Sequence, residues 1–328
     1  MQSMDKGQMK SYVMQRYPGC RVKCDSVRPH RNSWIYTLSI TSGKCSENIV
    51  VKIARNFQPR QVTREYESLL RFYRGCAGKD ICSPQPLFAD PERGIIAMKH
   101  VQGTILSYWL HELRPASIDC INHAVDLSAA ALAQYHGLFR SPDGQPLSVD
   151  CSAPEEDINC FLEESRGRID DCNLRSRVVP FFDFTTWNMI VRRDPSGMRL
   201  FLIDFPRLDY VCTPHLDLAR FRFGLELIKQ FPPARFSGLS RWDLDQLFDR
   251  FLTGYCRRTD ASLNEADLLL IGRARKAYLR RAANLARKGD CGWQPKLEQA
   301  YLQIFSRQWL DQKGVHSNWP AMSRAEKA

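Results

Sequence analysis

The sequence predicts an α+β fold of two lobes, the first rich in strands and the second mainly helical. Apolar side chains alternate over residues 34–41 and β-branched residues fill 48–54, and both patterns are typical of strands. After Gly103 the apolar residues recur every three or four positions, which is typical of helices packed on a core. Strands and helices that occupy separate stretches of the chain favour an α+β architecture.

The first part of the chain is expected to hold a hairpin, a helix and a further strand. The strands at residues 34–41 and 48–54 flank turn-forming residues at 42–44. Helical spacing of apolar residues extends over 61–73, and residues 95–98 form a short apolar run that suits a buried strand. These elements divide the chain into a strand-rich N-terminal lobe, a connector and a helical lobe, at residues 1–98, 99–103 and 104–328.

The helical lobe is expected to contain one long buried helix and a second hairpin. Ser117 can cap a helix whose apolar stripe spans residues 121–138. Two short strands at 189–191 and 200–203 flank the Asp-Pro-Ser-Gly sequence at 194–197, which is a strong turn signal.

The composition is that of an ordinary globular protein. Of the 328 residues, 44% are hydrophobic and 25% are charged, and no apolar stretch is long enough to span a bilayer. Charged residues near the N-terminus and the lack of an apolar run after them predict no secretory signal. The twelve cysteines include no Cys-x-x-Cys pair, so we expect reduced, mostly buried thiols, neither a zinc site nor disulfides, and a cytoplasmic location.

The chain is strongly basic. It carries 47 Lys and Arg against 36 Asp and Glu, a formal charge of +11, which attracts polyanions. Nucleic acid, anionic lipid and phosphorylated substrates are all compatible with this charge.

Lys52 and Glu65 are placed where a phosphate-binding pair would be. Lys52 follows the apolar run 49–51 in an expected strand, and Glu65 lies thirteen residues later in the expected helix. Phosphoryl transfer from ATP needs a lysine for the donor phosphates and a carboxylate that holds it. Taken singly, each residue also fits a surface position.

The second chemical segment is the loop and hairpin from residue 181 to residue 205. Asp183 and Asn188 directly precede an apolar strand, so one loop can hold a carboxylate and an amide oxygen. Asp204 ends the next apolar strand, where a carboxylate is expected to be paired or to bind a cation. The hairpin therefore brings Asn188 and Asp204 together as oxygen ligands for Mg²⁺, or Asp204 simply caps the strand end.

These residues, in this order, resemble a known family. Asp183-x-x-x-x-Asn188, then Ile203-Asp204-Phe205 and then Asp217-Leu-Ala, look like the aminoglycoside phosphotransferase and choline kinase group of the protein-kinase-like fold. Lys52, Glu65 and the connector match the upstream pattern of that group, so the resemblance covers roughly residues 30–225.

The resemblance implies an ATP- and Mg²⁺-dependent kinase and assigns a role to each matching residue. Asp183 would be the catalytic base and Asp217 a structural residue that holds the catalytic loop. Of the remaining matches, Lys52, held in an ion pair by Glu65, would bind the donor phosphates, the backbone of Met98, Lys99 and Val101 would bind adenine, and Asn188 and Asp204 would bind the metal.

The sequence departs from the family pattern in two places. Phe181 replaces a histidine that supports the catalytic loop. The expected phosphate loop, residues 28–34, has no glycine, so Arg31 and Ser33 would have to bind phosphate through their side chains. The alternative function is therefore a pseudokinase that binds a partner or an anionic polymer without catalysis.

The acceptor is predicted to be a sugar hydroxyl. Segments 217–223, 239–244 and 251–255 resemble, less specifically, the lipopolysaccharide core heptose kinases, which implies an anionic envelope glycolipid and peripheral contact with the inner membrane. Residues 272–289 carry seven basic residues and no acid beside an apolar helical stripe. This face suits either solvent or anionic headgroups. We expect no nucleic-acid partner, because no recognition motif accompanies the charge.

Overall fold

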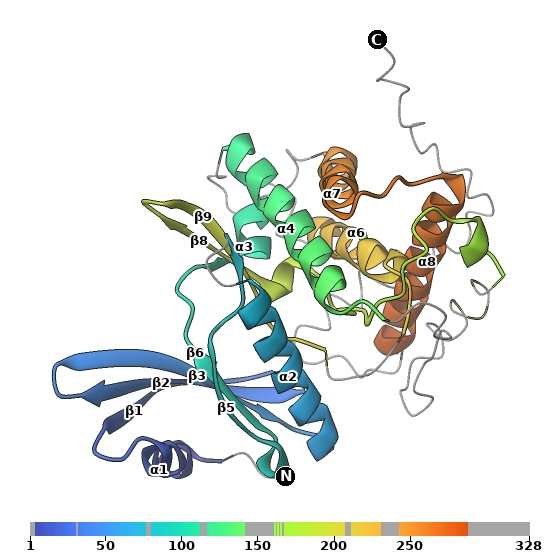
Figure 1. Ribbon diagram of the computed structural model, residues 1–328. Coiled ribbons are helices and arrows are strands. Elements are labelled where there is room, and N and C mark those ends of the chain that lie inside the picture. The colour runs from blue at the N-terminus through green and yellow to red at the C-terminus, as the bar shows by residue number, and fades with distance from the viewer. Residues whose placement is uncertain are drawn as a thin grey trace. The chain divides into compact units, whose positions relative to one another are not determined.

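The computed structural model describes residues 4–30, 32–76, 80–111, 117–141, 161, 163, 165, 167–206, 211–230 and 243–287. The chain forms two compact units, residues 1–278 and 279–328. The first unit contains a strand-rich part and a helical part (Figure 1), so the α+β prediction is confirmed.

The strand-rich part is built on an antiparallel sheet of five strands in the order β1-β2-β3-β6-β5. Its elements, in chain order, are α1 Lys6–Arg16, β1 Arg21–Pro29, β2 Ser33–Ser42, β3 Cys45–Ala54, α2 Pro59–Gly75, β5 Pro86–Asp90, η1 Pro91–Arg93 and β6 Ile95–Lys99. The expected strands and the helix after them are confirmed, with longer bounds than the sequence indicated.

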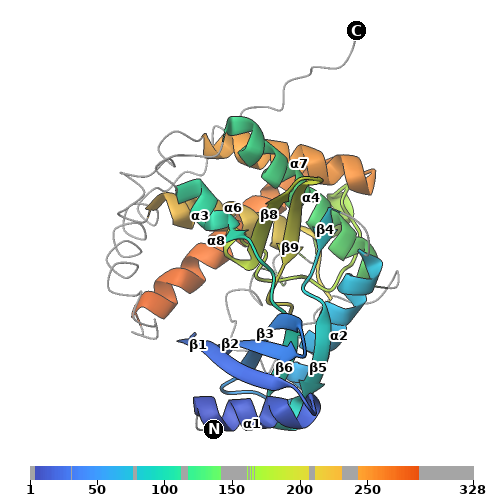
Figure 2. The same cartoon turned by 90° about the vertical axis from the view of Figure 1, so that its left-hand side faces the viewer.

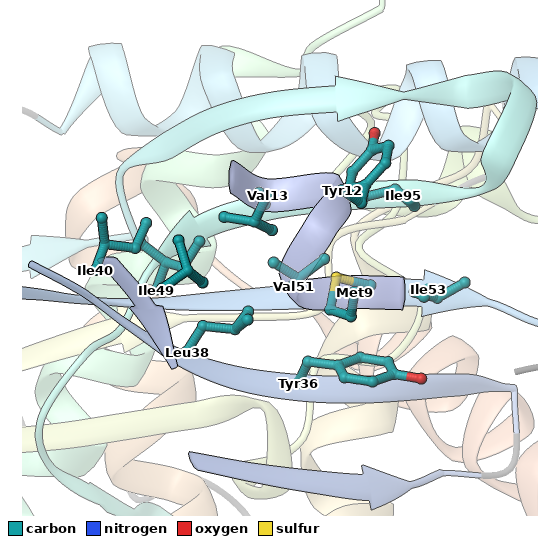
Figure 3. Close-up of a cluster of buried hydrophobic side chains, with 12 residues drawn as sticks. Met9, Tyr12, Val13, Tyr36, Leu38, Ile40, Ile49, Val51, Ile53 and Ile95 are labelled. Carbon is teal, nitrogen blue, oxygen red and sulfur yellow. The ribbon is translucent and has the colours of Figure 1, made fainter. Parts of the chain in front are cut away.

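The two faces of this sheet are covered by different helices. Figure 3 shows side chains of α1, such as Met9 and Val13, over residues of β2 and β3 such as Leu38 and Val51. Successive residues of a strand point to opposite faces. Lys52, next to Val51, therefore points away from α1 and meets α2, which lies on the other face.

A second sheet carries the predicted hairpin. β4 Ile81–Cys82, β7 Thr104–Ile105, β8 Met189–Asp194 and β9 Gly197–Leu202 are ordered β4-β9-β8-β7. β4 and β7 thus attach the chain before and after β6 to the hairpin (Figure 2). Gly103 makes this possible: its φ is +156°, and an added Cβ would lie 2.6 Å from the carbonyl oxygen of Val191.

Helices make up most of the remaining described residues of the first unit. Their bounds, with those of the short 3-10 helices, are α3 Leu106–His111, α4 Ile118–Leu138, η2 Ile169–Asp171, η3 Thr186–Asn188, α6 His215–Gln230, α7 Leu244–Thr259 and α8 Glu265–Arg287. Leu279 and the residues after it in α8 belong to the second unit. The predicted central helix, α4, is buried along most of its length and packs against α7. Ser117 is its N-cap residue, but its side chain makes no capping hydrogen bond.

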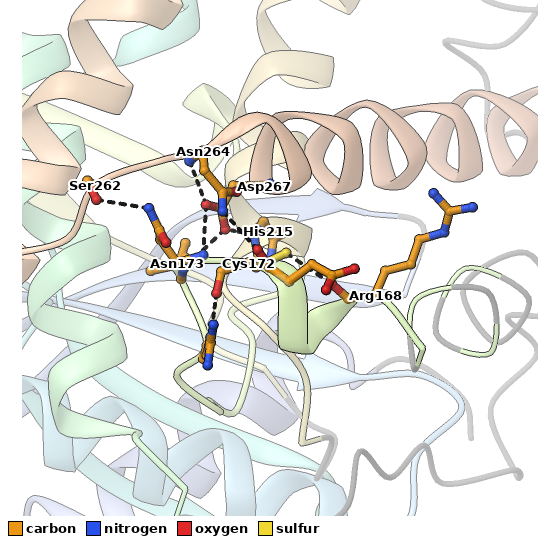
Figure 4. A network of polar contacts seen from close by, with 10 residues as sticks. Arg168, Cys172, Asn173, His215, Ser262, Asn264 and Asp267 are labelled. Atoms are coloured by element: carbon orange, nitrogen blue, oxygen red, sulfur yellow. Dashed lines mark hydrogen bonds and ion pairs between the residues drawn. The ribbon is translucent and has the colours of Figure 1, made fainter.

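Asp267 anchors the start of α8 (Figure 4). Its two carboxylate oxygens accept hydrogen bonds from the N–H groups of Asn264 and residues 173–174, and His215 Nε2 lies 2.8 Å from Oδ1. Cys172 also offers a possible ligand atom within 4.8 Å of those of His215 and Asp267. Because the four nitrogens occupy the lone pairs of both oxygens, the cluster serves as a packing anchor.

Two expectations need comment. Of the nine cysteines that the structure describes, only Cys76, Cys172 and Cys212 are buried, so the expectation of mostly buried thiols is wrong for this set. None of these nine forms a disulfide. Among the described residues, no helix has the length and apolarity that crossing a bilayer requires.

Candidate active site

Lys52 lies at the centre of a buried ion-pair cluster. Its ammonium is 2.6 Å from Oε1 of Glu65, and both side chains are almost completely buried, with 9% and 4% exposed. The strand–helix contact across the sheet therefore produces the pair that the sequence spacing of thirteen residues suggests. Lys52 also donates a hydrogen bond to Oδ1 of Asp204. This contact links the five-stranded sheet to the end of the β8–β9 hairpin.

Asp204 is held at the strand end in an unusual backbone conformation. Its φ is +61°, in the left-handed region that residues other than glycine rarely adopt. The next residue, Phe205, is buried against Phe72 and Phe181, with ring centroids 5.4 Å apart in each case. Burying Phe205 while turning the 47%-exposed Asp204 carboxylate towards Lys52 gives a physical reason for the strained backbone.

Asp183 and Asn188 occupy one loop, as predicted. Nδ2 of Asn188 donates to the backbone carbonyl of Asp183 at 2.9 Å and to Oδ2 of its side chain at 3.0 Å. The backbone carbonyl of Asn188 accepts from the N–H of Ile203, the residue before Asp204. The structure therefore brings Asp183, Asn188 and the Asp204 segment together.

Asp217 holds this loop from the start of α6. Its fully buried carboxylate accepts the N–H groups of Phe181 and Phe182, both at 2.7 Å. Nε2 of His136, in α4, lies 2.9 Å from Oδ2 of Asp217, and Nδ1 of His136 lies 2.8 Å from the Tyr255 hydroxyl. Burial and then the Asp217 charge raise the pKa of Tyr255, so its neutral hydroxyl can donate to Nδ1 and leave the Nε2 proton for Asp217.

Phe181 packs the start of the Asp183 loop against other aromatic rings. It is buried against Phe184, Phe205 and Tyr135, with ring centroids 5.6, 5.4 and 5.2 Å away. The backbone of the loop is thus fixed by Asp217, and its apolar side is fixed by aromatic contacts.

The sequence interpretation did not identify Arg220. Its Nε donates to Oδ1 of Asp183 at 3.0 Å, and its Nη2 contacts the same oxygen. The signal that could have found it is its position in α6, three residues after Asp217, because that spacing places both side chains on one face of a helix.

The structure describes only some of the residues that were expected to contact the nucleotide. Ser33 begins β2 and is buried opposite Ala54 of β3, and Arg31 lies outside the described residues. Met98 pairs with Val50 in the β3–β6 ladder. The backbone N–H of Lys99 donates to the carbonyl of Gln85, so it is already used and cannot also donate to adenine.

The basic stretch forms the larger part of α8. As predicted, Ile271, Ala274 and Tyr278 are buried on its apolar stripe. Arg275 is paired with Glu226 of α6 at 2.8 Å, so not all of the basic residues face solvent. Residues 239–242 and 288–289, which belong to the acceptor and basic motifs, lie outside the described part of the chain.

Solved structures of small-molecule kinases share this fold. The chain is similar to a glucosamine kinase solved in complex with glucosamine, ADP and inorganic phosphate, at 15% identity and a TM-score of 0.56, over 94% of this chain and 88% of that chain. Crystal form A of glucosamine kinase aligns at 14% identity with a TM-score of 0.56, over 94% and 85% of the two chains.

A further neighbour is the spectinomycin phosphotransferase APH(9)-Ia, in complex with ADP and spectinomycin, at 10% identity and a TM-score of 0.49, over 92% and 95% of the two chains. No family model and no curated protein matches the sequence. The similarity to the glucosamine kinase structures identifies the fold as the bilobal protein-kinase-like fold.

Proposed function

We propose that the protein is an ATP-dependent kinase that transfers the γ-phosphoryl group to a sugar hydroxyl. The observation that carries this is the position of Lys52 between Glu65 and Asp204. One buried cation touches two carboxylates from separate elements, and the Asp183–Asn188 loop is joined to the same hairpin. Phosphoryl transfer depends mainly on positioning and on neutralising phosphate charge, and this cluster provides groups for both.

The residues present fit a magnesium ion. Asp204 offers a half-exposed carboxylate, and Asn188 keeps its amide oxygen for another partner, because its amide nitrogen donates to Asp183. Mg²⁺ prefers such hard oxygen ligands. When bound, it would supply positive charge beside the donor phosphates. Asn188 and Asp204 would hold it, and Lys52, kept in place by Glu65, would contact the phosphates.

The remaining steps belong to the side chain of Asp183 and to the connector. Asp183 would orient the acceptor hydroxyl and accept its proton. Residues 99–103 would form the hinge between an ATP-binding lobe at 1–98 and an acceptor lobe from residue 104. Because the N–H of Lys99 is already used, Val101 is the better donor to adenine within the proposed hinge.

The sugar acceptor is supported by the fold neighbours, of which glucosamine kinase was solved with glucosamine. An anionic envelope glycolipid, reached by a cytoplasmic enzyme at the membrane surface, is the narrower proposal. The basic residues of α8 support it, since Lys276 and Arg280 are exposed there. Surface charges act through about 8 Å at physiological salt, so they attract an anion only nearby.

The central test compares two variants with a charge-matched control. Asp183→Asn is expected to abolish phosphate transfer from labelled ATP to sugar acceptors while leaving nucleotide binding near normal. Asp204→Ala is expected to lose the Mg²⁺-dependent part of the thermal stabilisation by ATP. Asp126→Asn, at a surface ion pair with Arg250, serves as the control and should change neither. Transfer by Asp183→Asn within a few-fold of wild type would contradict the base, and a wild type that transfers no phosphate would favour the pseudokinase.

The acceptor class needs its own experiment. Reversing Lys276 and Arg280 to Glu should raise the KM for an anionic glycolipid and leave the KM for ATP and for a neutral aminosugar unchanged. Added salt should mimic the double variant in the wild type. Reversing Lys6 and Lys10, exposed on α1, changes the net charge equally and is the control. An equal effect of both pairs would show that only the total charge matters, and no effect would remove the glycolipid proposal.

A further inference from the structure

Helix α6 holds the Asp183 loop at two points. Asp217 accepts the backbone N–H groups of residues 181–182, and Arg220, one turn later, contacts the Asp183 carboxylate through Nε and Nη2. A single rigid element therefore fixes both the backbone of the loop and the side chain that would react. Such double support is what a precisely oriented carboxylate requires.

Arg220 is itself held in place by aromatic rings. Its guanidinium carbon lies 5.2 Å from the ring centroid of Phe223 and 5.0 Å from that of Tyr278. These two rings are 5.8 Å apart and inclined by only 24°. The Arg220 side chain is 19% exposed, against 45% for Asp183. A planar guanidinium beside aromatic rings loses little further freedom when it binds a carboxylate.

The two oxygens of Asp183 have different partners. Oδ1 accepts hydrogen bonds from Nε and Nη2 of Arg220, whereas Oδ2 accepts only one, from Nδ2 of Asn188 at 3.0 Å. A carboxylate oxygen has two acceptor sites. Among the described contacts, Oδ1 is therefore full and Oδ2 has one acceptor site left.

We propose that Arg220 is a positioning residue that fixes the Asp183 carboxylate so that Oδ2 receives the proton of the acceptor hydroxyl. This inference rests on the proposed kinase function. In the step, the acceptor O–H bond breaks and its proton moves to Oδ2, while the acceptor oxygen bonds to the γ-phosphorus. The bond from that phosphorus to the bridging oxygen breaks, ADP leaves with the electron pair, and Oδ2 later releases the proton to water.

The test removes Arg220 and restores its chemistry from solution. Arg220→Ala should lower kcat about 100-fold, the cost of misplacing a reacting group by about 1 Å, and leave the KM for ATP within about twofold. Guanidinium chloride below denaturing concentrations should restore part of kcat. Arg220→Lys, which keeps the charge but loses the forked contact, should have a kcat between those of the wild type and Arg220→Ala. If Arg220→Ala does not fold, Arg220→Lys takes its place in the test.

The matched control is Arg222→Ala. Arg222 lies on the same helix and pairs with Glu226 and Asp245, away from Asp183. This variant should lose thermal stability, keep kcat within about threefold, and not respond to guanidinium. A kcat within threefold of wild type in Arg220→Ala or, if that variant does not fold, in Arg220→Lys would overturn the inference, as would a loss that guanidinium does not rescue. A wild type without phosphate transfer to any sugar would instead overturn the proposed function, and the inference would fall with it.

Discussion

Replacing Asp217 by Asn tests how the Asp183 loop is held. The carboxylate is fully buried and accepts three contacts: two backbone N–H groups at 2.7 Å and His136 Nε2 at 2.9 Å. An amide has only one oxygen, so at least one loop N–H would face an NH₂ group. A hydrogen bond to a charged group contributes about 1.5–3 kcal/mol, and the remaining bonds weaken when the charge is lost. Together these losses predict a destabilisation of about 3 kcal/mol.

Urea unfolding of the full chain measures this loss as a change in the free energy of unfolding. Asp126→Asn is the control, since Asp126 makes its ion pair at the surface and should cost less than about 1 kcal/mol. The loop should also shift, so kcat should fall more than the KM for ATP rises. If Asp217→Asn unfolds within 1 kcal/mol of wild type, Asp217 is not the anchor of this loop.

Three further predictions concern the Lys52–Glu65 ion pair, Gly103 in the connector and Asp267 at the start of α8. Lys52→Met and Glu65→Gln should each lower ATP turnover, and Lys52→Met should lower it more strongly. The double variant should be little worse than Lys52→Met, because the two residues act as a unit; full additivity of the two losses would contradict this coupling. Gly103→Ala should lower the melting temperature more than Gly43→Ala, because a Cβ at Gly103 meets a backbone oxygen at 2.6 Å whereas one at Gly43 meets nothing within 4 Å; equal losses in calorimetry would refute this.

For Asp267, burial raises the pKa of the carboxyl, but the bonds from a histidine and backbone N–H groups outweigh burial and hold the pKa below 3.8. The unfolded chain therefore binds more protons between the two pKa values, so this contribution to stability is complete above about pH 4 and is lost as the pH falls through the folded pKa. Urea titrations should show the deficit of Asp267→Asn shrinking below pH 4, and a constant deficit would disagree.

Positions in the fold were predicted best for residues that lie within a clear local sequence pattern. The β-branched run before Lys52 and the helical spacing around Glu65 specify a strand and a helix, and α/β packing then joins them. Asp204 followed from the apolar strand before it. In each case a local pattern fixed the direction of the side chain.

Contacts between distant segments were not predictable in this way. Arg220 meets Asp183 only because α6 folds back on the loop 37 residues earlier. β4 has two residues and pairs with β9 far along the chain, so it has no periodicity to detect. The hydrogen bond from the Lys99 N–H to the carbonyl of Gln85 was not predicted either, because Gln85 directly precedes β5, a strand that the sequence analysis did not identify. By contrast α1 has a readable signal, the capping box of Asp5 and Gln8.

The attachment of the Asp183 loop to a buried carboxylate also determines how the backbone of this loop exchanges hydrogen with water. Loop amides usually exchange through small local openings. The N–H groups of Phe181 and Phe182 instead point at a fully buried Asp217, which α4 and α7 hold through His136 and Tyr255. To release these protons, the loop must leave a buried carboxylate that α4, α6 and α7 hold in place. The two amides should therefore exchange as slowly as those in the middle of α4, and the loop should melt together with its helices.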